Sequence, residues 1–229
     1  MKHVIAGIFS IFFLFSTGLA AEKPELKDRR EKESYSLGFQ FGKNMKYQGV
    51  DIDLDLYAAG VRDALSGQEP RMTDGEIRSA IQDLQQRLAA ARQEELKAQA
   101  AKNIEAGKTF LSENGKKDGV KTLPGGLQYK VLSEGSGKMP KVSDNVTVHY
   151  RGTLIDGSEF DSSIARGQPA SFQVNRVIPG WTQALQLMKE GARWQLFIPP
   201  GLAYGERGAP PRIPPQSTLV FEVELISVK

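Results

Sequence analysis

The chain has 229 residues, enough for one large domain or two smaller ones, and its 30 Lys and Arg nearly balance 27 Asp and Glu. The formal net charge of +3 is spread without long blocks of one sign, which argues against a nucleic-acid-binding surface. There are no cysteines and only two histidines, His3 and His149. Thiol catalysis, disulfides and a lipid-modified N-terminal Cys are excluded, a metal site would depend on His149 alone, and no metal or cofactor is expected.

The N-terminus predicts a signal peptide over residues 1–20. Lys2 supplies positive charge, residues 4–14 are an apolar run, and Gly18 and Ala20 are small residues at −3 and −1 of a cleavage site. A retained anchor is the alternative, but the run is shorter than the ~20 apolar residues of a spanning helix. We therefore expect cleavage after Ala20 or Ala21, no stable membrane span after signal removal, and a periplasmic or secreted protein.

Residues 21–72 predict a helical dimerisation segment made of two short helices. The first carries one apolar face, and Asp53 is a candidate N-cap for the second, which is expected to end at Ser66-Gly67. Two short helices cannot enclose a core, and Phe39, Gly42 and Tyr57 have no evident partner within the chain. We expect a homodimer that forms through residues 35–88.

Residues 73–121 predict a long linking helix and a linker. Thr73-Asp-Gly-Glu76 has the pattern of a capping box, and the run up to about Asn114 is rich in helix-forming residues and lacks proline. Apolar residues recur at helical spacing over residues 77–88 and then thin out, so we expect the first part to pack and the later half to be a solvated stalk. A continuous coiled coil is the alternative, and the absence of Leu or Ile at heptad spacing past Leu88 disfavours it.

Residues 122–229 predict a separate α+β domain of short strands. In two segments apolar residues alternate with other residues, so each segment predicts a strand with one buried face. These buried faces carry Tyr150 and Phe221. His149 has the opposite orientation to Tyr150 and is expected to be an ordinary outward-facing histidine. Residues 177–191 predict a strand end, a Pro-Gly turn and a helix that runs from Trp181 to a C-cap at Gly191.

The indole of Trp181 is expected to face the protein interior from the first turn of this helix. Taken alone, Trp181 is most simply a core residue. Other aromatic residues from surrounding strands and loops change that interpretation and favour an apolar pocket with Trp181 as its floor. These residues are Tyr150, Phe160, Phe172, Tyr204 and Phe221.

Several motifs occur in a fixed order over residues 127–229. They are Val148-His-Tyr150-x-Gly152, Gly157-x-x-Phe160-Asp161-Ser-Ser163, Val177-Ile178-x-Gly180-Trp181, Ala203-Tyr204-Gly205, Ile213-Pro214-Pro215 and Leu219-Val-Phe221-x-Val223-x-Leu225. Together they resemble the FKBP family of peptidyl-prolyl cis/trans isomerases. The preceding region resembles the helical dimerisation segment and linking helix of the macrophage infectivity potentiator-like branch.

This resemblance implies an antiparallel sheet of five or six strands wrapped around the Trp181 helix, and a pocket between them. Trp181 is then the floor beneath the substrate proline, and Asp161 lies near the carbonyl of the amide that rotates. The Ile178 N–H and the Tyr204 hydroxyl are similar to the family's donors to substrate carbonyls. The resemblance implies catalytic roles for Asp161, Tyr204, Trp181 and Phe221, and substrate-binding roles for Tyr150, Phe160, Phe172, Val177, Ile178 and Ile213. From the residues alone, Asp161 as a turn cap and Tyr204 as a surface tyrosine remain open.

The implied activity is accelerated rotation of Xaa-Pro bonds during the folding of exported proteins, without a cofactor. Proline-containing polypeptides are then the clients, and macrolides are candidate inhibitors. Ala170 and Arg212 depart from the commoner family pattern, which leaves subsite preference and macrolide affinity open. The alternative is a periplasmic chaperone that holds unfolded clients in the cleft of a dimer.

Overall fold

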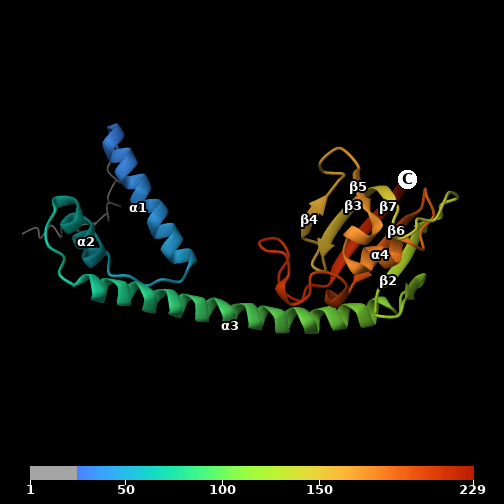
Figure 1. Ribbon diagram of the computed structural model, residues 1–229, viewed down its shortest axis with the longest axis horizontal. Coiled ribbons are helices and arrows are strands. Elements are labelled where there is room, and N and C mark those ends of the chain that lie inside the picture. Colours follow the sequence, from blue (N-terminus) through green and yellow to red (C-terminus); the bar gives the residue numbers. More distant parts are fainter. Residues whose placement is uncertain (1–24) are drawn as a thin grey trace, which may run out of the picture. The chain divides into compact units, whose positions relative to one another are not determined.

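The structure, a computed structural model, describes residues 25–229. These residues divide into two compact units, one up to Thr73 and one from Asp74 to Lys229 (Figure 1). The predicted signal peptide over residues 1–20 lies outside the described residues. Within residues 25–229, no helix is both long enough and apolar enough to cross a bilayer.

The first unit contains the two predicted short helices, α1 (Arg29–Tyr47) and α2 (Leu54–Ser66). The predicted N-cap is confirmed, because the Asp53 side chain accepts hydrogen bonds from the backbone at the start of α2. The prediction that Tyr57 and Phe39 lack partners within the chain is wrong. The Tyr57 ring stacks on Phe41 with centroids 4.2 Å apart, and Phe39 lies 6.0 Å from Tyr35.

Most of the large apolar side chains of this unit are nevertheless exposed to solvent. Neither helix contains a fully buried residue. The exposed side chains include Tyr35, Leu37, Phe39, Tyr47, Leu54, Leu56 and Leu65. Two helices in contact cover too little surface to bury an apolar face on each, as the sequence indicated.

The long helix α3 (Asp74–Asn114) ends where the sequence predicted, but its later part is not simply a solvated stalk. Gly107 and Asn114 are buried, and the Phe110 ring lies 5.9 Å from Phe197 of the sheet. A Cβ atom added at Gly107 would lie only 2.4 Å from Thr218 Oγ1, so glycine permits the close approach. Figure 1 shows this end of α3 beside β2. The last turns of α3 are therefore part of the second unit's packing.

The second unit contains a seven-stranded antiparallel sheet in the order β1-β2-β6-β7-β3-β4, with β5 also paired to β3. The first strand begins inside the stretch that the sequence assigned to the linker, which explains one strand beyond the five or six expected. β4 and β5 pair with different halves of β3. The strands are β1 (Val120–Thr122), β2 (Gln128–Ser133), β3 (Asn145–Leu154), β4 (Glu159–Ser162), β5 (Ala170–Gln173), β6 (Arg193–Ile198) and β7 (Leu219–Val228).

The helix α4 (Pro179–Leu185) packs on this sheet and is shorter than predicted. Its C-cap is Gln186, and the expected cap Gly191 lies beyond the helix, where its N–H donates to the Leu225 carbonyl at 2.7 Å. The chain has therefore already left the helix to join β7. Met188 is still fully buried. The apolar spacing therefore predicted the burial of this residue correctly, but the prediction of where the helix ends was wrong. As the alternation predicted, β3 and β7 bury the faces that carry Tyr150 and Phe221.

Candidate active site

An open cavity of about 630 Å³ lies over α4, at the face of the sheet. All of the residues that the sequence proposed for the site line this one cavity. The complete lining is Tyr150, Phe160, Asp161, Phe172, Arg176, Val177, Ile178, Trp181, Tyr204, Ala209, Pro210, Pro211, Arg212, Ile213 and Phe221. These residues come from β3, β4, β5, β7, the start of α4 and the loops beside them.

The indole of Trp181 is the aromatic centre of this cavity. It is only 4% exposed, and three rings meet it nearly edge-on: Phe221 at 5.2 Å, Tyr150 at 5.3 Å and Phe172 at 6.0 Å between centroids. Such edge-to-face pairs are a favourable arrangement of aromatic rings. The indole N–H has no hydrogen-bond partner in the described part of the chain. Held by three neighbouring rings, Trp181 offers the cavity a rigid aromatic floor.

The glycine of the Tyr150-x-Gly152 motif allows two of the aromatic walls to meet. The rings of Phe160 and Phe221 lie 5.4 Å apart at 84°. A Cβ atom at Gly152 would lie 2.7 Å from both rings, closer than side chains tolerate. This residue type is therefore required by the packing of the wall and contributes no functional group of its own.

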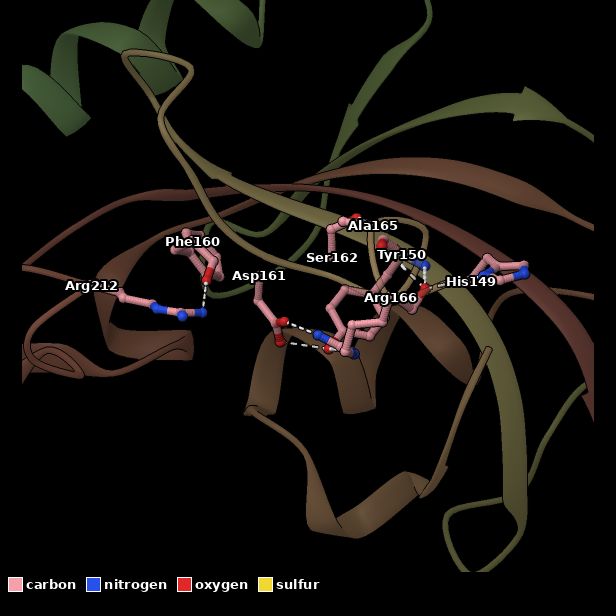
Figure 2. Close-up of polar contacts among 9 residues, drawn as sticks. His149, Tyr150, Phe160, Asp161, Ser162, Ala165, Arg166 and Arg212 are labelled. Carbon is pink, nitrogen blue, oxygen red and sulfur yellow. Dashed lines mark hydrogen bonds and ion pairs between the residues drawn. The ribbon is translucent and has the colours of Figure 1, made fainter. Parts of the chain in front are cut away.

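A hydrogen-bonded network of three side chains forms the polar part of the site (Figure 2). The Tyr150 hydroxyl donates to Asp161 Oδ2 at 2.5 Å, and Arg166 Nη2 donates to the Tyr150 hydroxyl at 2.8 Å. Arg166 Nη1 also forms an ion pair with Asp161 Oδ1. Asp161 thus binds two side chains in addition to any part it has in the turn that follows it.

The network shifts the pKa values of its members. Partial burial by itself would raise the pKa of Asp161, but the hydrogen bonds from Tyr150 and Arg166 and the guanidinium charge outweigh it and lower the pKa. Burial, together with the hydrogen bond to Asp161, raises the pKa of Tyr150. Burial and the negative charge of Asp161 raise the pKa of Tyr204. At neutral pH the network therefore holds one carboxylate, one guanidinium and one neutral phenol, and Tyr204 is a second neutral phenol beside it.

Ser163 fixes the backbone of Tyr150. Its hydroxyl accepts the Tyr150 N–H at 2.8 Å and donates to the Tyr150 carbonyl at 3.2 Å, while its own N–H donates to that carbonyl. His149 Nδ1 lies 3.1 Å from the same hydroxyl and does not line the cavity. His149 is therefore a half-buried neighbour of the motif and not part of the cavity wall.

Besides the buried Trp181 N–H and the Arg176 guanidinium, two hydrogen-bond donors at the cavity are unused within residues 25–229. Neither the Ile178 N–H, at the N-cap of α4, nor the Tyr204 hydroxyl donates to another group there. Tyr204 is 41% exposed, as expected for a residue at the mouth. A bound peptide carbonyl could accept from either donor. In the same part of the chain, no group of three or more His, Asp or Glu side chains is arranged to hold a metal ion.

The loop that follows Gly208 covers one side of the cavity. Its residue Ile213 is buried, and the backbone of Ile213 exchanges two hydrogen bonds with Ala209. Arg212 Nη1 donates to the Phe160 carbonyl at 2.9 Å and so ties the loop to β4 (Figure 2). Ala170 faces the core from β5 and does not line the cavity.

The sequence interpretation missed Arg166, Arg176 and Ser163. Arg166 could have been found as the nearest positive charge after Asp161, in the turn that follows β4. Ser163 was part of a quoted motif but received no role. Arg176 carries no motif signal, and only the position of its side chain at the cavity brings it forward.

This fold and cavity define a known class of protein. The model of the FKBP-type peptidyl-prolyl cis-trans isomerases matches residues 136–226, and the model of the domain amino-terminal to it matches residues 30–131. The chain belongs to this family and is a peptidyl-prolyl cis-trans isomerase. The crystal structure of FkpA from Escherichia coli is similar, with a TM-score of 0.71 and 43% identity over 90% of this chain and 99% of that chain.

Within the family the chain belongs to the macrophage infectivity potentiator branch. It is 46% identical to the outer membrane protein MIP of Legionella longbeachae, over 100% of this chain and 98% of that protein. It is 45% identical to the peptidyl-prolyl cis-trans isomerase Mip of Coxiella burnetii, over 100% of this chain and 99% of that protein. The predicted family, branch, fold class and enzyme class are confirmed.

Proposed function

We propose that the cavity over Trp181 is where the prolyl bond of a client rotates. The observation that carries this proposal is the combination of an aromatic cavity with two unused donors, the Ile178 N–H and the Tyr204 hydroxyl. The proline ring rests on Trp181, between the rings of Tyr150, Phe172 and Phe221. The two donors hold substrate carbonyls on each side of the bond that turns.

The physical basis is that a twisted amide needs no reactive group. Rotation of an amide has a barrier of about 18–20 kcal/mol, and an Xaa-Pro bond turns over in tens of seconds or more without help. The planar amide is the more polar form, so a water-poor aromatic cavity favours the twisted form relative to water. Lowering the barrier by about 4 kcal/mol gives roughly a thousandfold acceleration.

Asp161 contributes a fixed negative charge beside the cavity in this mechanism. Its carboxylate is held by Tyr150 and Arg166, so it does not need to reorganise when the amide twists. We assign Asp161, Tyr204, Trp181 and Phe221 catalytic roles. Tyr150, Phe160, Phe172, Val177, Ile178 and Ile213 bind the substrate.

A protease-coupled assay on a short Xaa-Pro peptide tests this assignment. The purified full chain should accelerate the slow phase, and Trp181→Leu combined with Tyr204→Phe should remove most of that acceleration. Full activity in the double variant would count against the cavity as the site. Circular dichroism of the variant separates a loss of activity from a loss of fold.

The clients are proposed to be exported proteins, folded in the periplasm or outside the cell. The signal-peptide pattern over residues 1–20 and the name of the Legionella relative, an outer membrane protein, support this location. Cell fractionation of an untagged strain, with an immunoblot of each fraction, tests it. A band confined to the cytoplasm, at the mass of the full chain, would contradict it.

The active form is proposed to be a homodimer that assembles through residues 35–88. Leu37 is 75% exposed and Leu65 is 85% exposed in a single chain, and burial of such side chains favours association. Two cavities in one dimer would raise the effective concentration of a bound client. Light scattering at micromolar concentration tests the proposal, and a monomer mass would contradict it.

The same exposed side chains support a second candidate function, a chaperone that holds unfolded clients. A full chain with Leu37→Asp and Leu56→Asp separates the two activities. If holding depends on this surface, the variant loses suppression of client aggregation and keeps peptide isomerisation. The reverse pattern is expected for Trp181→Leu, which changes the floor of the cavity and leaves the exposed side chains of α1 and α2 as they are.

A further inference from the structure

The charges that line the isomerase cavity are unbalanced. Its charged lining residues are Asp161, Arg176 and Arg212. The Asp161 carboxylate is already paired with the guanidinium of Arg166, which offsets its charge toward the two other arginines. Neither Arg176 nor Arg212 forms an ion pair within residues 25–229. The cavity therefore combines apolar walls with two uncompensated guanidinium groups.

Both arginines are placed to meet a ligand. Their side chains are exposed, so their charge acts on whatever enters the mouth. Arg212 precedes Ile213 in the loop that covers the cavity, and we call Ile213 the roof residue. Arg212 Nη1 donates to the Phe160 carbonyl, which orients the guanidinium and leaves its other N–H groups free. Arg176 immediately precedes Val177 and Ile178, which line the cavity on another side. A guanidinium offers several donors in a fixed plane, which suits a carboxylate.

We propose that this enzyme selects proline segments that carry an aspartate or glutamate within two residues of the proline, through Arg176 and Arg212. The inference rests on the proposed cavity as the site of prolyl rotation and adds a substrate class to it. An acidic side chain beside the proline replaces water at one or both guanidinium groups while the proline ring occupies the aromatic floor. A basic side chain at the same position is repelled.

The size of this preference follows from exposure. Charges at a solvated rim interact weakly, so we expect a carboxylate to raise kcat/KM about threefold to tenfold over its neutral amide, and an ammonium group to lower it similarly. Added salt screens such pairs, so the difference should shrink severalfold at about 0.5 M salt. A preference of apolar origin would not respond in this way.

The test uses the full chain and a set of short peptides that differ only at one position. Glu, Gln and Lys are placed in turn at each of the two positions before and after the proline, and kcat/KM is measured by exchange spectroscopy. This readout avoids a coupling protease, whose own charge preference would interfere. In the wild type, Glu should exceed Gln for at least one position, and Lys should fall below Gln there.

Variants connect the preference to the two arginines. Arg176→Gln and Arg212→Gln should each reduce the Glu-over-Gln ratio toward one, whatever change each makes to turnover of the Gln peptide itself. Arg212→Lys keeps the charge and should keep most of the ratio, even though its contact with Phe160 changes. Arg87→Gln, an exposed residue of α3 outside the cavity, makes the same change in net charge and should leave the ratio as it is.

The outcomes separate this inference from the proposed function. If no position favours Glu over Gln at low salt, or if Arg87→Gln lowers the ratio as much as the cavity variants, the acidic preference is wrong. Turnover of the Gln peptides would still support the isomerase site in that case. If no peptide is turned over at all, the proposed function fails first.

Discussion

The Tyr150 hydroxyl and the Asp161 carboxylate share a 2.5 Å hydrogen bond at the edge of the aromatic cavity. Arg166 contacts both groups, so the three side chains restrain one another. Charge-assisted hydrogen bonds of this kind are stronger than neutral ones. The carboxylate is consequently fixed in place before a substrate arrives.

The coupling of this pair is the first prediction. Tyr150→Phe and Asp161→Asn should each lower kcat/KM by about tenfold, and the double variant should lose less than the product of the two, with a coupling of about 1 kcal/mol. Kinetics of the four proteins on one peptide measure it. Strictly multiplicative losses would mean that the hydroxyl and the carboxylate act separately.

The second prediction concerns pH. The pKa of Asp161 is lowered, and the pKa values of Tyr150 and Tyr204 are raised, so none of them changes charge between about pH 5 and about pH 9. We expect kcat/KM to be constant over this range. A bell-shaped profile would instead require a titrating group in the mechanism.

Stability should respond to acid through the same carboxylate. Because the folded-state pKa of Asp161 lies below its unfolded value, its contribution is present above the unfolded pKa and is lost as pH falls through the folded pKa. Asp161→Asn should therefore be less stable than the wild type at neutral pH, and the difference should shrink below about pH 4. Urea unfolding at several pH values measures it. A difference that does not vary with pH would contradict the assignment.

The third prediction separates the two tryptophans. Trp181 lines the cavity, whereas Trp194 of β6 is 5% exposed and stacks on Tyr129 with centroids 4.3 Å apart, outside the cavity lining. Replacing either with Phe should cost about 1–3 kcal/mol of stability, because both are buried. Only Trp181→Phe should also lower kcat/KM, by about tenfold. Equal activity losses in both variants would indicate a general effect of destabilisation.

The fourth prediction concerns the loop over the cavity and the long helix. Asn103 of α3 donates through Nδ2 to the Pro215 carbonyl at 2.7 Å, two residues beyond the roof residue Ile213. The Ser217 hydroxyl donates to the adjacent Pro214 carbonyl at 2.8 Å. Asn103→Ala should leave this end of the loop less restrained and raise KM by about twofold to fivefold, with a smaller effect on kcat.

Glu105→Ala, an exposed change on the same helix, is the matched control for Asn103. Peptide kinetics give KM and kcat for both variants. If Asn103→Ala behaves like Glu105→Ala, the helix does not position the loop.

Sequence reasoning was most successful where local rules decide the structure. The N-cap at Asp53 follows from capping, the end of α3 at Asn114 from the extent of the helix-forming run, and the buried faces of β3 and β7 from alternation. The aromatic residues of the cavity were singled out from the strand and loop pattern around Trp181, and the family motifs supplied their roles, although their rings come from segments up to 71 residues apart, from Tyr150 to Phe221. Their roles remain proposals that the variants above test.

Sequence reasoning failed where tertiary contacts decide. The helix after Trp181 stops at Leu185 because the chain is drawn to β7, which no local signal at Gly191 reveals. The docking of α3 depends on one small residue, Gly107, opposite Thr218, and these residues lie far apart in the sequence. Arg166 was missed because an arginine in a polar turn usually has no function.

The attachment of α3 sets a limit on how far this enzyme can be shortened. A version that starts at residue 122 would leave Phe197 without the ring of Phe110. It would also remove both hydrogen bonds of the Gln128 side chain, which accepts from Asn114 Nδ2 and donates to the Leu111 carbonyl. The shortest fragment that folds and keeps isomerase activity should therefore begin upstream of Asn103. Removing residues beyond that point would remove the contacts by which the end of α3 supports the sheet, even though α3 also serves as a connecting helix.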